Sequence, residues 1–117
     1  MKFVVVVAIT PEEMEEEAVH RAQAQGAAGV TVLSAKGLSA EARRTFFGLT
    51  FEGSQSVLVM VVARHVALGI LKAMRDLLVR EGGDSRGLAF SLPVEHVAGL
   101  DMEQVLAFDK RLHQKEG

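Results

Sequence analysis

The sequence contains no cysteine, no tryptophan and no tyrosine among its 117 residues. Without cysteine it can form neither disulfides nor thiolate metal sites, and this agrees with the reducing cytoplasm, where we expect the protein to reside. Because aromatic residues make up only 5%, the core must be built from aliphatic side chains and the six phenylalanines.

The chain also lacks a strong charge of either sign and a long hydrophobic run. The net charge of −2 leaves no basic stripe for a phosphate backbone, so we do not expect a nucleic-acid partner. The apolar run Phe3–Ile9 is too short for a secretion signal or a membrane span, so the protein is not expected to insert into a membrane. A hydrophobic content of 49% excludes a disordered chain, and the length suits a single domain over 1–117.

The run Phe3–Ile9, rich in β-branched residues, predicts a buried strand. A helix is expected to start directly after it. Thr10 has the side chain of an N-cap, Pro11 suits the first helical position, and Glu13 completes a capping box.

The first helix has an apolar face formed by Met14, Ala18 and Ala22, which are four residues apart. Gly26 is expected to end the helix. The apolar segment Val30–Ala35 then predicts a second strand. The first third of the chain therefore has the order strand, helix, strand.

The same order returns later in the chain. Val57–Ala63 predicts a strand, His65–Arg80 a helix, and Leu88–Leu92 a strand that Pro93 ends, with a glycine-rich turn at 81–87. The helix is expected to bury Ala67, Ile70, Leu71, Met74, Leu77 and Leu78. Met102, Val105, Leu106 and Leu112 indicate a short C-terminal helix.

Two successive strand–helix–strand units predict an α+β, ferredoxin-like fold, in which an antiparallel βαββαβ sheet carries both helices on one face. The other face would meet water, yet 3–9 and 57–62 are apolar at nearly every position. Self-association would bury this second face, so we expect a homo-oligomer. In the alternative, the C-terminal helix covers the open face of a monomer.

Three segments give the chain a resemblance to the PII signalling family, in its divergent PII-like branch. They are Gly29-Val-Thr-Val-Leu-Ser-Ala-Lys-Gly37, the excursion that follows it, and Gly87-Leu-Ala-Phe-Ser-Leu-Pro-Val-Glu-His-Val97. The resemblance implies a homotrimeric, non-enzymatic regulator that binds a small-molecule effector, typically an adenine nucleotide, between subunits. It also implies a flexible T-loop-like segment at about 38–55, which docks onto a membrane transporter or an enzyme.

The resemblance assigns ligand-binding positions to three residues. Thr31 matches a threonine near the adenine edge, Gly37 the glycine at the T-loop base, and Gly87 a glycine of the loop on the phosphate side. Glycine suits such loops because exposed N–H groups can approach an anion where no side chain intervenes.

The family's cationic phosphate ligands are largely missing. Leu38-Ser39-Ala40 follows Gly37, Leu88 replaces a lysine, and Gly99 and Asp101 align near two arginines. Arg43, Arg44 and Arg86 are the candidates to replace the lost charge. AMP or ADP is therefore a more acceptable effector than ATP, and no cofactor is expected to be required.

The excursion itself contains a basic doublet, Arg43-Arg44, followed by Phe46 and Phe47. These residues are candidates for docking a partner protein, since exposed aromatic residues at this density need one. The alternatives are solvated arginines, and phenylalanines that pack back on the core.

No metal site is expected, because no pair of the four histidines has a recognisable ligand spacing. Two alternative functions remain open. One is a metal-binding or metal-tolerance trimer similar to the CutA family, and the other is a small ferredoxin-like enzyme, although the sequence offers no convincing acid, base or nucleophile set.

Overall fold

The computed structural model describes residues 2–36, 45–46, 49–50, 54–101, 103, 106–107 and 110. The elements are β1 (Phe3–Pro11), a short 3₁₀ helix η1 (Glu12–Met14), α1 (Glu15–Ala24), β2 (Thr31–Lys36), β3 (Thr45–Phe46), β4 (Leu49–Thr50), β5 (Ser54–Ala63), α2 (Arg64–Leu78) and β6 (Leu88–Pro93). Strands β3 and β4 form a separate two-stranded sheet.

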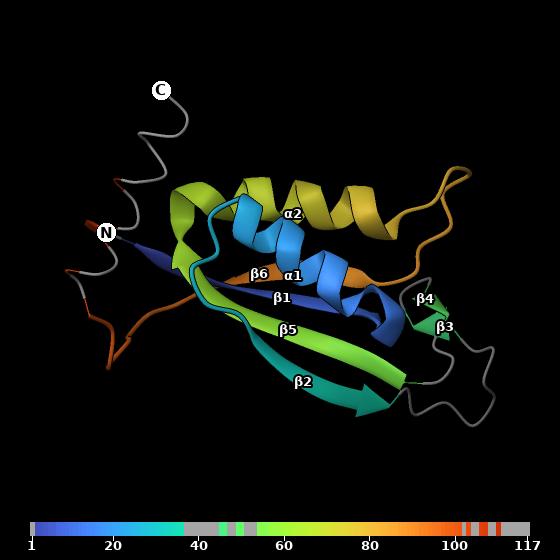
Figure 1. Cartoon of the computed structure of the whole chain (residues 1–117), viewed down its shortest axis with the longest axis horizontal. Coiled ribbons are helices and arrows are strands. Elements are labelled where there is room, and N and C mark those ends of the chain that lie inside the picture. The colour runs from blue at the N-terminus through green and yellow to red at the C-terminus, as the bar shows by residue number, and fades with distance from the viewer. Residues whose placement is uncertain are drawn as a thin grey trace.

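The main sheet has the strand order β2-β5-β1-β6, and all of its pairings are antiparallel. Both helices lie on the same side of this sheet (Figure 1). The predicted ferredoxin-like βαββαβ fold is therefore confirmed.

The core lies between the sheet and the two helices. Ala18 and Ala22 of α1 are fully buried, so two small side chains let this helix approach the sheet closely. The larger part comes from α2, which buries Ala67, Ile70, Met74, Leu77 and Leu78, as its periodicity predicts, while Leu71 is half-buried. From the sheet, the buried apolar side chains are Val6, Ala8, Leu58, Met60 and Val62.

The predicted capping box at the start of α1 is wrong. Thr10 and Pro11 are still strand residues, paired with Ser56 and Gln55 of β5. The Thr10 hydroxyl donates a hydrogen bond to the Pro11 carbonyl, 3.0 Å away, and α1 itself begins only at Glu15. Ladder pairing with β5 therefore overrides the local capping preference.

The strands β1 and β5 are longer than the apolar pattern indicated. Strand β5 begins at Ser54 rather than Val57, because its polar first residues pair with Ala35 and Lys36 at the end of β2. Helix α2 ends at Leu78 rather than Arg80, because Val79 is already extended and forms a bridge to Ser85.

Of the predicted C-terminal helix, the structure describes Glu103, Leu106, Ala107 and Lys110, and all four are helical. The side chain of Leu106 is half exposed. The other expected inner residues, Met102, Val105 and Leu112, lie outside the described residues.

Candidate functional site

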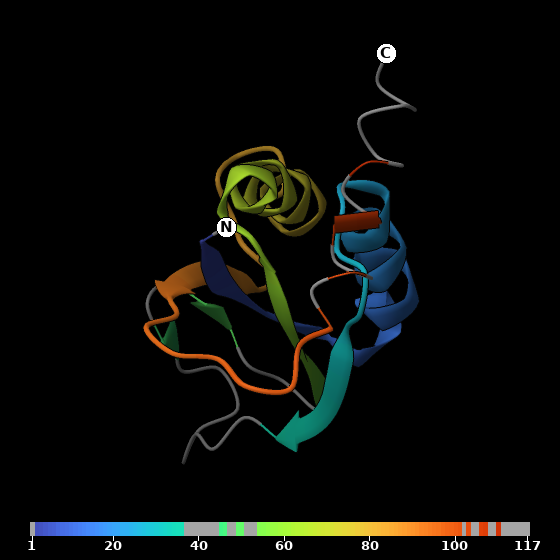
Figure 2. The same cartoon turned by 90° about the vertical axis from the view of Figure 1, so that its left-hand side faces the viewer.

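The sheet has a second apolar face, on the side opposite α1 and α2 (Figure 2). The strand registers place on it Phe3, Val5, Val7 and Ile9 of β1, Val57, Val59 and Val61 of β5, Leu88, Phe90 and Leu92 of β6, and Leu33 of β2. We call these residues the open face. Leu33 is 51% exposed and Leu92 52%, whereas antiparallel sheets that face water usually carry polar residues on that side.

Thr31 lies at the start of β2, exposed and on the same side of the sheet as the open face, in register with Val59. Gly87 directly precedes β6, which is the opposite edge of the sheet. Three strand spacings of about 4.8 Å separate the two edges by about 14 Å. The two residues are also offset along the strands, because Leu88, which follows Gly87, is level with Leu33 rather than with Thr31.

Gly87 is buried and has a packing reason to be glycine. An added Cβ would lie 2.2 Å from the Ile9 carbonyl oxygen and 2.9 Å from a methyl carbon of Leu78. Because real Cβ atoms do not approach so closely, the residue must lack a side chain for β6 to run beside β1 under the end of α2. This close packing by itself accounts for the glycine.

The turn at 79–87 closes on itself through backbone hydrogen bonds. The Arg80 N–H donates to the Asp84 carbonyl at 2.7 Å, and the Gly83 N–H donates to the Arg80 carbonyl at 3.1 Å. Gly82 and Gly83 both have positive φ, of 94° and 87°, a conformation that other residues rarely adopt. The two glycines of this turn therefore serve its backbone geometry.

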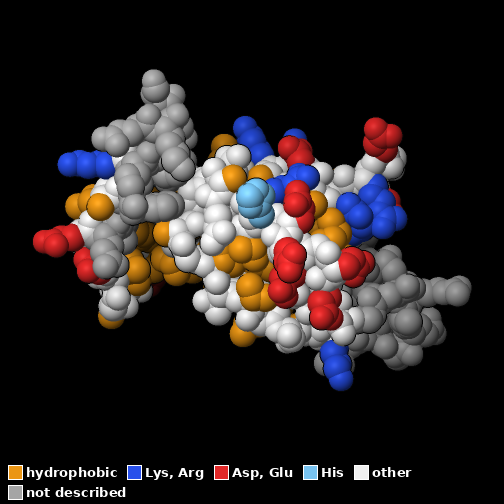
Figure 3. All heavy atoms as spheres, in the orientation of Figure 1, with side chains coloured by type: hydrophobic (Ala, Val, Ile, Leu, Met, Phe, Trp, Pro, Cys, Tyr) orange, Lys and Arg blue, Asp and Glu red, His pale blue; other side chains and the backbone are white. Residues whose placement is uncertain are grey.

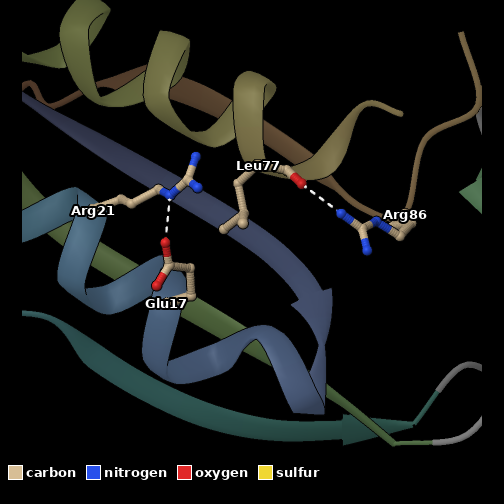
Figure 4. A network of polar contacts seen from close by, with 4 residues as sticks. All are labelled: Glu17, Arg21, Leu77 and Arg86. Carbon is tan, nitrogen blue, oxygen red and sulfur yellow. Dashed lines mark hydrogen bonds and ion pairs between the residues drawn. The ribbon is translucent and has the colours of Figure 1, made fainter. Parts of the chain in front are cut away.

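Arg86 is held at the end of α2. One terminal nitrogen of its guanidinium donates to the Leu77 carbonyl at 2.9 Å (Figure 4). The backbone N–H of Arg86 donates to the Leu78 carbonyl. A cation at a helix C-terminus interacts favourably with the helix dipole. The Nε atom is buried and has no hydrogen-bond partner among the described residues, so the guanidinium retains one unused donor.

Four of the predicted loop residues, Gly37, Arg43, Arg44 and Phe47, lie outside the described residues. Phe46 is the second residue of β3, where it pairs with Leu49. The predicted docking roles of the loop therefore remain predictions.

A polar contact at the loop end of the sheet was missed by the sequence reasoning. The Ser56 hydroxyl, fully buried on β5, donates to Glu15 Oε1 at 2.6 Å. Its neighbour in register, Thr10, is also buried. The signal available in the sequence was a serine one residue before the apolar run of β5, but its partner is 41 positions away.

Acidic side chains gather over η1 and the start of α1 (Figure 3). The cluster consists of Glu12, Glu13, Glu15, Glu16 and Glu17. Glu17 forms an ion pair with Arg21 at 2.8 Å, one helical turn further along α1 (Figure 4). Most of this cluster is exposed, as expected for a solvated helix face near the positive end of the helix dipole.

Within the described part of the chain, no group of three or more histidine, aspartate or glutamate side chains is placed to hold a metal ion. The same residues include no helix long and apolar enough to cross a membrane.

Among solved structures, 174 chains match this one. One of them is the crystal structure of a protein of Thermus thermophilus that is provisionally described as a PII-like signaling protein. The two chains share 21% sequence identity with a TM-score of 0.60, over 80% of this chain and 87% of that one. No protein-family model and no curated protein matches the sequence. The chain therefore has the fold of a PII-like protein, and the resemblance predicted from its sequence is confirmed at the level of fold.

Proposed function

We propose that this protein is a PII-like regulatory protein that acts by binding rather than by catalysis. In this proposal it forms a homotrimer, binds a small effector in clefts between subunits, and regulates a membrane transporter or an enzyme through the segment 38–55. The observation that carries the proposal is the open face, a sheet surface of eleven apolar side chains on the side opposite α1 and α2. A fold alone does not license a function.

The geometry of the predicted ligand residues supports a site between subunits. Thr31 and Gly87 lie on opposite edges of one sheet, and packing sheets around a symmetry axis would bring such edges of neighbouring protomers together. Adenine nucleotides are the proposed effectors. AMP and ADP are favoured over ATP, because the turn at 79–87 carries Glu81 and Asp84 and its Arg86 is engaged by the end of α2.

Association is tested by measuring the solution mass with light scattering at micromolar concentration. We expect a trimer for the natural sequence and a monomer for Leu33→Glu, which places a charge in the open face. The matched control is Leu68→Glu, because Leu68 is 62% exposed on α2 and lies outside the open face. A natural chain that is monomeric, or a Leu68→Glu variant that dissociates equally, would contradict the proposed use of this face.

Effector binding is tested by isothermal titration with AMP, ADP, ATP and cyclic dinucleotides. We expect AMP or ADP to bind, with a loss of affinity in the dissociated Leu33→Glu variant because each site needs two protomers. If none of these compounds binds, the nucleotide part of the proposal is wrong. The trimer is tested separately, by the solution mass.

Arg86 distinguishes a ligand role from a purely structural one. If it contacts the effector, Arg86→Met weakens nucleotide binding more than the loss of stability explains. If it serves only the end of α2, the variant lowers the free energy of unfolding by about 1 kcal/mol and leaves the affinity unchanged.

A further inference from the structure

A cleft of about 770 Å³ lies at the end of the sheet where β1 begins and β6 ends. Three segments far apart in the sequence form it: the start of β1, the first residue of α2 and the chain that follows β6. Figure 2 shows all three on the side that faces the viewer. The volume falls within the range of small-molecule sites, about 300–1,000 Å³. The two edge positions discussed above, Thr31 and Gly87, are not part of its lining.

Backbone hydrogen bonds hold the cleft together. The Arg64 N–H donates to the Lys2 carbonyl at 2.9 Å, and the Val94 N–H donates to the Phe3 carbonyl at 3.3 Å. The start of β1 is therefore tied both to the start of α2 and to the end of β6. A ligand would meet a surface that is already formed and would pay little to order it.

The cleft has an excess of one positive charge. Lys2 and Arg64 line it, and within the described residues neither forms an ion pair or a side-chain hydrogen bond. The first turn of α2 contains no acidic residue, so nothing on the helix neutralises Arg64 there. Glu95 is the one carboxylate in the lining. Two cations and one anion suit a ligand with a single negative charge.

The remaining lining is mostly apolar, from Phe3 and Val97 among others, with the Ser91 hydroxyl as a further hydrogen-bond donor. Val97 is 47% exposed, so its side chain still has surface to bury. A hydrocarbon group would cover this surface favourably. A carboxylate fits the polar end, because guanidinium groups bind carboxylates in paired geometry. A phosphate monoester, with a charge close to −2, would be repelled more strongly by Glu95.

We propose that this cleft is a second binding site, within one protomer, for a small organic monocarboxylate with an apolar body. Arg64 and Lys2 bind the carboxylate, Ser91 donates to it, and Phe3 and Val97 contact the hydrocarbon part. Glu95 excludes ligands with two negative charges. The site is distinct from the proposed effector site between subunits, and it shares Phe3 with the open face.

The test uses phenylacetate as the probe and the full-length protein labelled with ¹⁵N. Titration is expected to shift the backbone amide signals of Ser91, Val94 and Val97, with a dissociation constant at or below about 1 mM. The neutral analogue 2-phenylethanol and inorganic phosphate are expected to bind at least about tenfold more weakly. The first lacks the negative charge, and the second lacks the apolar body. Absence of these shifts up to about 10 mM phenylacetate, or equal binding of 2-phenylethanol, overturns the proposal.

Charge variants test the roles assigned to the two cations and to Glu95. Lys2→Gln and Arg64→Gln should each weaken phenylacetate binding about tenfold, whereas Arg75→Gln, on an exposed arginine of the same helix, should leave it unchanged. Glu95→Gln should have the opposite effect, with tighter phenylacetate binding and a measurable affinity for inorganic phosphate. An Arg64→Gln variant that binds as the natural chain does, or a Glu95→Gln variant that loses binding, contradicts the assignment. Lys2, Arg64 and Glu95 are all exposed, so none of these substitutions is expected to disturb the core, and the Lys2 and Glu95 variants test the assignment independently of Arg64.

Discussion

Val61 and Val62 are adjacent on β5 and chemically identical, yet Val61 is 41% exposed and Val62 only 4%. The difference arises because successive strand residues point to opposite faces, and only one face receives the two helices. The same contrast runs along β1 and β5: the helix face holds the fully buried core, while the open face is just as apolar and remains accessible in one protomer. The apolar residues of these strands therefore serve two faces, of which folding of one protomer buries only the helix face completely.

The largest expected effect on stability comes from substituting a leucine of the helix face, in comparison with a leucine of the open face. Leu58, fully buried on the helix face, should lose about 2–5 kcal/mol of unfolding free energy on substitution by alanine, because the change leaves a cavity. The same substitution at the half-exposed Leu33 should cost less than about 1 kcal/mol in the monomer. Urea unfolding at several protein concentrations measures both values.

If Leu58→Ala and Leu33→Ala lower the free energy of unfolding equally at low protein concentration, the contrast between the faces is refuted. A cost at Leu33 that grows with protein concentration would sharpen it, because association that buries Leu33 depends on concentration.

Gly87→Ala should have the next largest effect. The new Cβ would collide with the Ile9 carbonyl, and the shift needed to relieve the collision should cost about 1–3 kcal/mol. Gly29→Ala is the matched control, because nothing lies within 4 Å of its added Cβ, and it should stay within about 0.5 kcal/mol of the natural chain. Thermal unfolding of the two variants side by side gives the comparison. A Gly87→Ala variant as stable as Gly29→Ala would show that β6 does not pack against β1 this closely.

Ser56→Ala probes a polar group inside the helix face. Removing its hydrogen bond to Glu15 should lower the free energy of unfolding by about 1 kcal/mol, since the half-buried carboxylate can regain water. Ser54→Ala, two residues earlier on the same strand and exposed, should change it by less than about 0.5 kcal/mol. Denaturant titration resolves the difference, and identical values for the two variants would mean that the contact with Glu15 contributes nothing.

The smallest effect is expected on the outer surface of the helix layer. Arg21→Gln removes the ion pair with Glu17, whose side chains are 38% and 52% exposed, and should cost about 0.3–0.5 kcal/mol. A double-mutant cycle with Glu17→Gln isolates this pair. Its coupling energy should vanish in about 1 M salt, where charges are screened within about 3 Å. A coupling that survives such salt would mean that the pair is effectively buried.

Much of the fold follows from periodicity. The fourfold spacing in α1 and the amphipathic face of α2 correctly identified buried residues such as Ala18, Ile70 and Met74, because helix packing depends on these same spacings. The start of α1 was wrong because Thr10 and Pro11 satisfy two local rules at once, and the choice between strand and helix was made by pairing with β5.

The candidate sites were less accessible to sequence reasoning. Gly87 was identified, but its contact with the Ile9 carbonyl depends on a residue 78 positions earlier in the chain. The cleft was missed entirely, because Lys2, Arg64 and Glu95 share no motif and meet only through the antiparallel ladder. Charged residues at strand ends are common, and only their placement makes them a group.

The sequence by itself determined the order of the elements, which residues of each strand share a face, and the inner faces of both helices. These properties depend on residues a few positions apart. Only the tertiary structure decided which apolar face the helices cover, where Arg86 donates its hydrogen bonds and which charges line the cleft. These depend on the way each helix crosses back over the sheet, which brings together residues from opposite ends of the chain. No local pattern contains that information, since β1 and β5 are apolar on both faces.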